Sequence, residues 1–392
     1  MSKSAREALL LHSREGEGEN GTNSTNEYAN TSTGSRTFWK KTTGGSNWRS
    51  VFVAVALLCL LLALSLLAAS VFSWMVTGGG SILLLGGSAP RFRRMILSFD
   101  PVSGKFVHRG KLNRQRYAPT AVRVPDGRVF VMASEAEGEG PWTKTTEIVD
   151  LRLGKISPGP NTLYYHGNYA ASCVVGNSIY LCGGSKGPGY CEVLDIERER
   201  MKWRPLNFSG YAIERHTAEY VDPYVYLIGG DTGYGLKQRS IDLLTPLRYH
   251  TASGNWSTPR EARMMVARRS AASAVLEVDG RLSIVVCGGF HYRLVARVHI
   301  KASQKSCKRY DVTEGRWKDF ASMNRPRAAL SLVAFKGGLF AFGGYGTEAA
   351  LVEPPVERWD PVTKQWEIVA NVSLDHQLWS AAAVAVDDPF LL

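Results

Sequence analysis

Hydrophobic positions follow two different patterns along this chain. Residues 51–74 form a single apolar run, VFVAVALLCLLLALSLLAASVFSW, and no charged residue occurs between Arg49 and Arg91. From residue 77 onwards the apolar residues come instead in short runs, most of which end in a pair of small residues. The second pattern predicts many short strands, because strand-length apolar runs bounded by turn residues are typical of β-structure.

The pairs of small residues recur at intervals of roughly fifty residues, the size of one repeat of a solenoid or propeller. They are Gly86-Gly87, Ala133-Ser134, Gly183-Gly184, Gly229-Gly230, Gly288-Gly289 and Gly343-Gly344. Most pairs are followed by an Asp-containing strand and then an aromatic residue, as in RYDVTEGRW, and later pairs are preceded by a strand of small residues, as in RSAASAV. Each unit therefore supplies four short strands, which predicts the blade of a propeller.

Six such units occupy residues 77–392, so we predict an all-β, six-bladed β-propeller. The first unit lacks a small-residue strand of its own, whereas the C-terminus ends with SAAAVAV, a strand without a unit. We predict that this last strand pairs into the first blade and closes the ring, since an open ring would leave exposed strand edges.

The repeat resembles the kelch family over residues 77–392. The residues that carry the resemblance are the Gly pairs, Tyr310-Asp311 with Trp317, and Trp359-Asp360 with Trp366. Ala133-Ser134 departs from the Gly pair, and the path from Asp242 to Trp256 is stretched, which leaves the blade boundaries there open. The resemblance implies a propeller that binds acidic peptides or sugars on one face.

The apolar run predicts a membrane-spanning helix. As a helix, residues 51–74 would be about 36 Å long, and the hydrocarbon core of a bilayer is about 30 Å thick. Trp48 and Trp74 lie at its two ends, where interfacial aromatics are favoured. Residues 1–50 are polar and predict a disordered tail. We interpret the run as an uncleaved signal anchor rather than a core helix or a cleaved signal peptide, which would be shorter and nearer the N-terminus.

Flanking charge predicts the orientation of this anchor. Basic residues without an acidic neighbour precede the run, and none follows it until Arg91. The positive-inside rule then places the tail in the cytoplasm and the propeller in the lumen or outside the cell, as in a type II membrane protein. Candidate glycosylation sites in the propeller are Asn207, Asn255 and Asn371. Triplets at Asn20, Asn23 and Asn30 in the tail argue for the opposite orientation.

Four cysteines occupy matching positions in two units. Cys182 and Cys287 directly precede a Gly pair, and Cys191 and Cys307 lie four residues before an Asp on the following strand. Facing residues of antiparallel neighbours are within disulfide range. We therefore predict the bridges Cys182–Cys191 and Cys287–Cys307, which would place the propeller in an oxidising compartment. The alternative is two pairs of buried free thiols; a shared zinc site is disfavoured because a further unit separates the pairs.

Charge adds a prediction about the ligand. The net charge is +12, which favours anionic partners. Four units open their first strand with an arginine six residues before a valine: Arg116, Arg215, Arg269 and Arg327. Because first strands line the channel of a propeller, we expect these arginines to ring its mouth and bind carboxylates or phosphates. Alternatively, they are solvated or hold neighbouring loops through carbonyl groups. Further candidates in loops are Trp142, His291, Tyr292 and Arg293.

Catalysis receives little support from the sequence. The segment RQRYAPTAVRVPDGRVFV looks like a stretch of galactose and glyoxal oxidases, but no spacing gathers the copper ligands that such enzymes need. A sugar-modifying propeller enzyme and a cytosolic protein scaffold remain alternatives. Our leading hypothesis is a membrane-anchored module for an anionic glycan or acidic peptide, with no catalytic residue, metal, cofactor or nucleic acid, and with an oligomeric state that the sequence leaves open.

Overall fold

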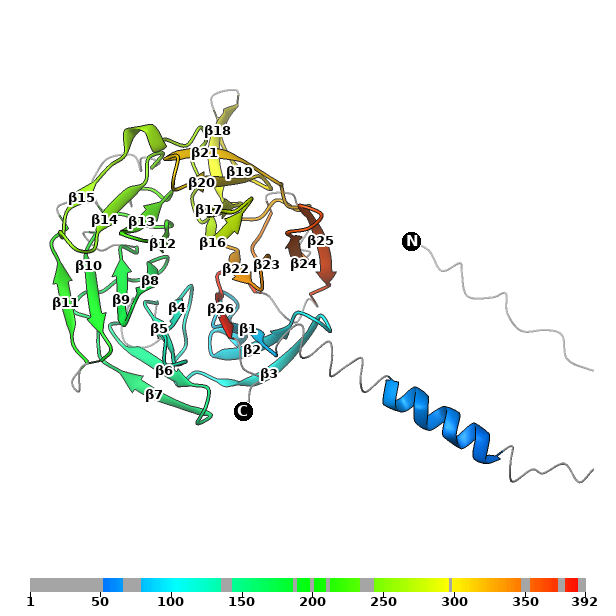
Figure 1. The fold of residues 1–392 in the computed structure, drawn as a ribbon. Coiled ribbons are helices and arrows are strands. Elements are labelled where there is room, and N and C mark those ends of the chain that lie inside the picture. Colours follow the sequence, from blue (N-terminus) through cyan, green and yellow to red (C-terminus); the bar gives the residue numbers. More distant parts are fainter. Residues whose placement is uncertain are drawn as a thin grey trace, which may run out of the picture. The chain divides into compact units, whose positions relative to one another are not determined.

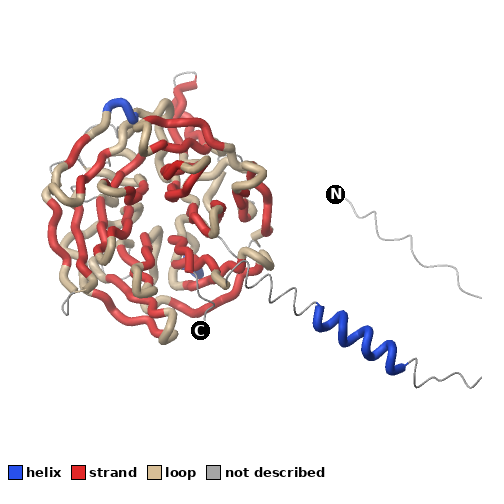
Figure 2. Tube along the Cα trace, in the orientation of Figure 1, coloured by secondary structure: helices blue, strands red, loops and turns tan. Residues whose placement is uncertain are grey.

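The computed structural model describes residues 52–65, 79–134, 143–185, 189–197, 201–208, 212–232, 243–295, 298–346, 353–372 and 378–386, apart from the side chains of 293–299. The chain divides into two compact units, Met1–Ser65 and Leu66–Leu392. The larger unit is a ring of six four-stranded antiparallel sheets around a central axis (Figure 1). The tube drawing shows the strands of each blade following one another outward from this axis (Figure 2). The all-β, six-bladed prediction is confirmed.

The first three blades are given from the innermost strand outward. Blade 1 contains β26 (Ala382–Val386), β1 (Ser81–Leu85), β2 (Met95–Asp100) and β3 (Lys105–Lys111). Blade 2 contains β4 (Thr120–Arg123), β5 (Val129–Met132), β6 (Thr146–Asp150) and β7 (Lys155–Gly159). Blade 3 contains β8 (Ala171–Val175), β9 (Ser178–Cys182), β10 (Cys191–Asp195) and β11 (Trp203–Leu206). The short 3-10 helix η1 (Pro90–Phe92) lies between β1 and β2.

The other three blades follow the same order. Blade 4 contains β12 (Thr217–Val221), β13 (Tyr224–Ile228), β14 (Leu247–His250) and β15 (Trp256–Ser257), followed by the 3-10 helix η2 (Arg260–Ala262). Blade 5 contains β16 (Ala272–Val278), β17 (Arg281–Cys287), β20 (Cys307–Asp311) and β21 (Arg316–Phe320). Its strands β18 (Phe290–Val295) and β19 (Val298–Ser303) form a separate two-stranded sheet. Blade 6 contains β22 (Ser331–Phe335), β23 (Gly338–Phe342), β24 (Val356–Asp360) and β25 (Gln365–Ala370).

The C-terminal strand closes the ring as predicted. β26 pairs with β1 in antiparallel register, from Ser81 opposite Val386 to Leu85 opposite Ala382 (Figure 1). The first blade is therefore made from both ends of the propeller sequence. This pairing satisfies the inner edge of β1, which would otherwise be an open strand edge.

The hydrophobic core lies between neighbouring blades. Every residue of β1 is buried, because each blade presses one face against each neighbour and no face is left for solvent. Phe99 of blade 1, for example, packs edge-on against Phe342 of blade 6 with ring centroids 5.2 Å apart. The innermost strands carry mainly Ala, Ser, Thr and Val, since bulkier side chains would not fit where the blades converge.

Glycine pairs allow the blades to approach each other. Gly183 and Gly184 adopt positive φ angles of 65° and 105°, and a Cβ atom at Gly184 would overlap the carbonyl of His166. The amide of Gly184 donates to the carbonyl oxygen of Ile213 in the next blade at 2.9 Å. A Cβ atom at Gly183 would overlap the same carbonyl oxygen of Ile213, so a side chain there would separate the two blades. The requirement for both glycines is therefore structural.

The smaller unit contains a helix over residues 52–65, which covers part of the apolar run. Residue 51 and residues 66–74 of the predicted anchor lie outside the described residues, as does the tail, 1–50. Within the part of the chain that is described, no helix has both the length and the apolar character needed to span a bilayer. The membrane anchor therefore stays a prediction.

Both predicted disulfides are present. Cys182 on β9 faces Cys191 on β10, and Cys287 on β17 faces Cys307 on β20, each pair with Cα atoms 4.1 Å apart. All four residues are almost completely buried. Cys173 is a buried free thiol that packs in the same cluster as the first bridge.

Removing either bridge should destabilise the propeller, and the second bridge should matter more. Cys287 and Cys307 are 20 residues apart, against 9 for the other pair, so the second bridge restricts a longer loop of the unfolded chain. We expect Cys→Ala pairs to lower the free energy of unfolding by about 2–4 kcal/mol, with roughly 0.7 kcal/mol more for the longer loop. Urea unfolding measures this difference, and peptide mapping under native alkylation that found four free thiols would contradict the bridges.

Candidate binding site at the channel mouth

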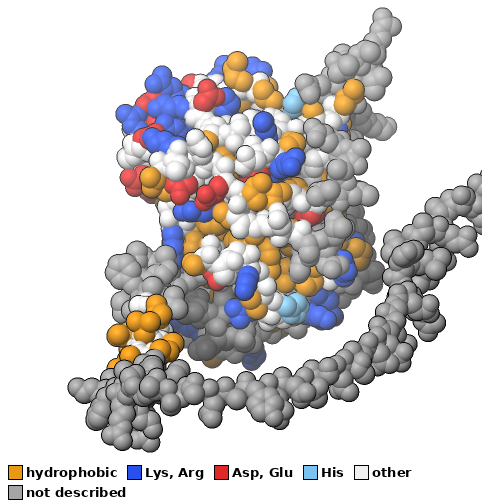
Figure 3. Space-filling model, turned by 90° about the vertical axis from the view of Figure 1, so that its right-hand side faces the viewer, with side chains coloured by type: hydrophobic (Ala, Val, Ile, Leu, Met, Phe, Trp, Pro, Cys, Tyr) orange, Lys and Arg blue, Asp and Glu red, His pale blue; other side chains and the backbone are white. Residues whose placement is uncertain are grey.

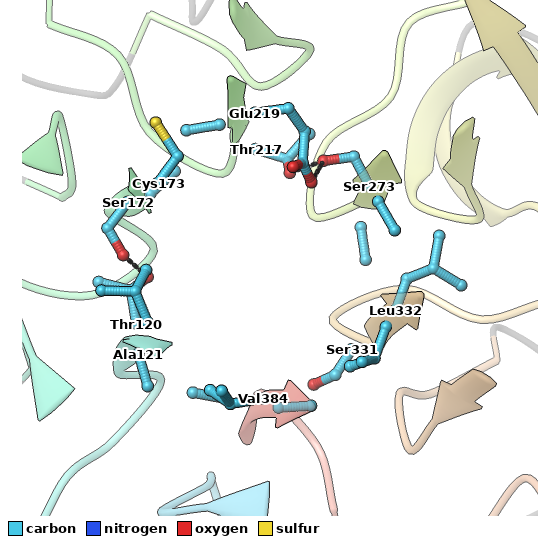
Figure 4. A pocket seen from close by; sticks show the side chains of 18 of the residues that line it. Thr120, Ala121, Ser172, Cys173, Thr217, Glu219, Ser273, Ser331, Leu332 and Val384 are labelled. Carbon is cyan, nitrogen blue, oxygen red and sulfur yellow. Dashed lines mark hydrogen bonds between the residues drawn. The ribbon is translucent and has the colours of Figure 1, made fainter. Parts of the chain in front are cut away.

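A narrow channel runs between the six innermost strands. Its volume is about 510 Å³, and residues from β4, β8, β12, β16, β22 and β26 line it. Figure 4 shows hydroxyl groups from neighbouring blades meeting along the wall of this channel. Thr120 Oγ1 and Ser172 Oγ are 2.6 Å apart, and Ser273 Oγ donates to Glu219 Oε1 at 2.7 Å (Figure 4). The channel wall therefore carries polar groups that are paired between neighbouring blades.

Glu219 is the acidic side chain of this channel wall. Burial raises its pKa to about 7, while the hydrogen bond from Ser273 acts in the opposite direction. Burial also raises the pKa of the neighbouring Cys173 thiol, and the charge of Glu219 adds to this effect. His216, nearer the mouth, has its pKa lowered to about 3 by burial, so its imidazole is neutral at physiological pH. Among the described residues, no group of three His, Cys, Asp or Glu side chains could hold a metal ion.

The channel mouth is a ring of residues with left-handed backbone conformation, one from each blade and each two residues before the inner strand. They are Ala118, Tyr169, Arg215, Ser270, Ala329 and Ser380. Backbone amides link successive members: Arg215 donates to Tyr169 at 3.2 Å, Ser270 to Arg215 at 2.9 Å, Ala329 to Ser270 at 2.8 Å and Ser380 to Ala329 at 2.9 Å. The same residues border a cavity of about 110 Å³. These bonds fix the direction in which Tyr169 and Arg215 leave the ring.

The four arginines expected at the mouth do not share one position in their blades. Arg215 belongs to the ring itself, Arg269 precedes Ser270 by one residue, and Arg116 and Arg327 lie two residues before their ring residue. In blade 5 it is Arg268 that corresponds to Arg116 and Arg327. Aligning the four arginines by the valine six residues after each one gave the wrong correspondence between blades. A strand of small residues has nearly the same sequence pattern after a shift of one position.

Arg116 and Arg327 are completely buried and hold loops of their own blades. Arg327 Nη2 donates to Glu357 Oε1 at 2.6 Å and to the carbonyl oxygen of Pro355 at 2.9 Å. Arg116 Nη1 donates to the carbonyl oxygen of Thr145 at 2.7 Å. Burial lowers the pKa of Arg327, and the charge of Glu357 opposes this effect. These two arginines therefore hold neighbouring loops through carbonyl groups, which was the alternative to ligand binding at the mouth.

A glutamate at the second position of the third strand explains this pattern. Glu147, Glu192 and Glu357 are all buried at this position of β6, β10 and β24. Each carboxylate accepts a backbone N–H from the loop before the inner strand, with donors Arg114 at 2.8 Å, Leu163 at 2.9 Å and Asn324 at 2.6 Å. The side chain that completes each site is Arg116, His166 or Arg327. These sites tie the loops together inside each blade and are not available to a ligand.

Arg215 and Arg269 share the buried carboxylate of Asp231. Arg269 Nη1 lies 2.7 Å from Asp231 Oδ2, and Arg215 Nη1 lies 3.3 Å from the same atom and also contacts Glu214. Burial acts to lower the pKa of Arg215, but the charges of Glu214 and Asp231 raise it above its ordinary value. Arg269 is 6 % exposed and Arg215 is 22 % exposed, so of the four predicted arginines Arg215 is the one that reaches the mouth.

Tyrosines from three other blades surround Arg215. Its guanidinium lies 5.4 Å from the ring centroid of Tyr169, and the Tyr169 hydroxyl is 3.3 Å from that of Tyr117. Lys301, on the β18–β19 sheet, donates from Nζ to the Tyr345 hydroxyl at 2.5 Å. Burial lowers the pKa of Lys301, and the positive charge of Arg215 adds to this effect. Tyr117, Tyr169, Arg215, Lys301 and Tyr345 are hereafter called the mouth cluster.

The loop candidates have mixed positions. Tyr292 is exposed and lies beneath Arg269, whose guanidinium is 5.2 Å from its ring centroid. His291 is half-buried, with Nδ1 3.1 Å from Gln304 Nε2. Trp142 and the side chain of Arg293 lie outside the described residues. The mouth cluster was mostly missed, although a tyrosine next to the start of a small-residue strand, as in RYAPTAV and NYAASCVV, is a signal that could have found two members.

The net positive charge does not form one continuous basic surface on the side of the molecule seen in Figure 3. Basic and acidic side chains lie next to each other there (Figure 3). Ion pairs of this kind occur on blade 5, where Lys318 Nζ lies 2.8 Å from Asp311 Oδ2 and 2.7 Å from Glu314 Oε1.

The buried arginines should be essential for stability. We expect Arg327→Ala to lower the free energy of unfolding by about 3–5 kcal/mol, because it leaves the buried carboxylate of Glu357 without its cation. The matched control is Arg358→Ala on β24, the strand that carries Glu357. This variant removes a partly exposed pair with Glu367 and should cost less than about 1 kcal/mol. Equal unfolding midpoints in urea for the two variants would contradict the structural role of Arg327.

Comparisons with known proteins agree with this architecture. No family model matches the chain. The chain is 26% identical over 214 residues to Kelch-like protein 40 of Xenopus laevis, which covers 50% of this chain and 32% of the relative. It is 24% identical over 216 residues to Kelch-like protein 23 of Mus musculus, covering 55% and 34%. Alpha-scruin of Limulus polyphemus is 28% identical over 218 residues, covering 52% and 22%.

A solved structure supports the fold independently. "Structure of YjhT" superimposes with a TM-score of 0.57 at 10% identity, covering 74% of this chain and 98% of that chain. The alignments to the kelch-like relatives span only about a third of the length of those relatives. Together with the closed ring of six four-stranded blades, these similarities support a kelch-repeat β-propeller.

Proposed function

We propose that this kelch propeller binds an acidic segment of a partner protein at its channel mouth. The observation that carries the proposal is the environment of Lys301. Its ammonium group lies 4.1 Å from the ring centroid of Phe290 and 4.3 Å from that of Tyr345. Among the described residues no carboxylate lies within ion-pair distance of it. A partly buried cation without a counter-ion favours an anionic ligand, because that ligand restores the charge balance lost on burial.

The other members of the mouth cluster would complete a carboxylate site. Both carboxylate contacts of Arg215 use Nη1, and a guanidinium has five N–H donors. The hydroxyls of Tyr117, Tyr169 and Tyr345 are further donors, and charge-assisted hydrogen bonds to a carboxylate are stronger than neutral ones. Aromatic rings beside these donors offer stacking area to a peptide. The kelch resemblance implies a binding face of this type. An anionic glycan is the alternative ligand, so the binding of a peptide must be compared with that of a glycan.

We further propose that the propeller faces the lumen or the exterior, held by residues 51–74. Two disulfides support an oxidising compartment, and the charges that flank the apolar run support a cytoplasmic tail. Asn207, Asn255 and Asn371 are all exposed, as glycan acceptors must be.

Removing the charge of Lys301 should weaken binding without unfolding the ring. Lys301→Met keeps most of the apolar contacts of the side chain and removes its charge, so we expect at least about tenfold weaker binding of an acidic peptide selected from an array. Lys155→Met, at the start of β7 and away from the mouth, is the matched control. Arrays of acidic peptides and of sialylated or sulfated glycans, probed with the intact chain, compare the two ligand classes. Unchanged peptide binding by Lys301→Met would contradict the proposal, and preference for the glycans would replace the peptide.

Protease protection tests the orientation. In microsomes, we expect the propeller to resist added protease until detergent is present, and to lose mass on treatment with an N-glycosidase because Asn207, Asn255 or Asn371 is modified. Asn→Gln variants at the three positions assign the modified sites. Digestion of the propeller in sealed microsomes would overturn the lumenal orientation and favour a cytosolic scaffold.

A further inference from the structure

The end of the propeller opposite the mouth carries exposed aliphatic side chains. They lie in the turns between the third and fourth strands of blades 1, 2 and 6. Val102 is 69% exposed, Leu153 is 74% exposed and Val362 is 88% exposed. In the equivalent turns of blades 4 and 5 the tip positions carry small or polar residues, Ala252 and Ser253, and Thr313 and Glu314. Among the described residues, which leave out 198–200 of the blade 3 turn, aliphatic tips of these turns therefore occur on blades 6, 1 and 2.

The turns hold these tips outward in a fixed conformation. Each turn begins with an aspartate whose carboxylate accepts backbone N–H groups of the turn. Asp100 Oδ1 accepts from Val102 at 2.9 Å, Asp150 Oδ1 from Leu153 at 3.0 Å, and Asp360 Oδ1 from Val362 at 2.7 Å. The aspartates thus serve the backbone, and the aliphatic side chains are left without packing partners. These side chains offer apolar area to any surface that meets this end of the propeller.

Lysines surround the tips on the same face. Lys105 and Lys155 open the strands that follow the turns of blades 1 and 2, and Lys336 lies in the turn between β22 and β23 of blade 6. All three are exposed, and among the described residues none of them forms an ion pair. Aliphatic tips surrounded by unpaired lysines match the boundary between the acyl chains and the phosphate groups of a bilayer. This is called the turn face: Val102, Leu153, Val362, Lys105, Lys155 and Lys336.

The chain also reaches the propeller at this face. Ile82 pairs with Phe99, so Ser81 at the start of β1 lies beside Asp100 and the Val102 turn. Only residues 75–80 separate Ser81 from Trp74, the end of the apolar run. Such a linker spans at most about 25 Å when fully extended. An anchor at 51–74 would therefore keep the turn face close to the membrane in which it is inserted.

We propose that the turn face rests on the phospholipid bilayer that holds residues 51–74, with the aliphatic tips in the interface and the lysines at headgroup phosphates. The inference rests on the proposed membrane anchor. It is independent of the ligand at the mouth, because the two sites lie at opposite ends of the channel. Its consequence is an orientation: the mouth cluster is directed away from the membrane, towards partners in the lumen or on another surface.

The test uses the full chain in vesicles of phosphatidylcholine with phosphatidylglycerol. A cysteine at the tip, Val362→Cys or Leu153→Cys in a Cys59→Ser background, carries an environment-sensitive fluorophore, and spin-labelled lipids act as quenchers. Matched controls are Thr313→Cys, in the equivalent polar turn of blade 5, and Met265→Cys, which is 93% exposed in the loop before β16. We expect a blue-shifted emission and at least about twofold more quenching at the tips than at Met265→Cys.

Charge variants test the second half of the proposal. Each lysine near an anionic leaflet contributes roughly a fivefold preference for the bound state, so Lys105→Glu with Lys155→Glu and Lys336→Glu should remove most of the quenching difference. Mouth binding of the acidic peptide should be unchanged in this variant. If the Lys301→Met chain no longer binds the peptide but its tips are still quenched, the docking of the turn face is unaffected.

Three results would overturn the docking. Loss of the chain from the membrane on carbonate extraction would remove the anchor and the docking together. A membrane-retained chain whose tips are no more quenched than Met265→Cys would overturn the docking alone. Self-association in detergent that Leu153→Asp abolishes would make a second copy of the chain the occupant of the turn face.

Discussion

Contact between blades without intervening side chains is the constraint on which the rest of the structure depends. The second glycine of a pair donates its amide to a carbonyl oxygen in the following blade, as Gly230 does to Arg268 at 2.8 Å and Gly289 does to Arg327 at 2.9 Å. These bonds form only where the backbone is left-handed and no Cβ atom intervenes. They place the start of each inner strand, and they therefore place the mouth ring, its outward-directed side chains and the narrow channel below it.

Charged residues divide into two groups according to their position relative to this ring. Arg116 and Arg327, two residues before the ring, are buried against glutamates and loop carbonyls, where they fix the loops of one blade. Arg215, at the ring itself, is held by acidic neighbours but remains partly exposed. A displacement of two residues along the chain thus decides whether an arginine is buried within its blade or reaches the mouth. Lys301 reaches the same region from an inserted pair of strands, outside the repeat pattern.

The two ends of the channel have different chemistry. The mouth combines tyrosine hydroxyls with cations, whereas the opposite end combines aliphatic turns with lysines. Both differences are local, since basic and acidic side chains alternate elsewhere on the surface seen in Figure 3. The proposed binding site at the mouth and the proposed contact of the turn face would use these two ends separately.

The amino-acid sequence by itself determined the number of blades, the closing strand and both disulfides, because each depends on a local pattern that repeats: a Gly pair, a small-residue strand, or cysteines in matching register. It did not determine which arginine reaches the mouth, since strands of small residues look alike after a one-residue shift and burial depends on the glutamate opposite. Nor did it group Tyr117, Tyr169, Lys301 and Tyr345. Those residues come from different blades, and only closure of the ring brings them to one point.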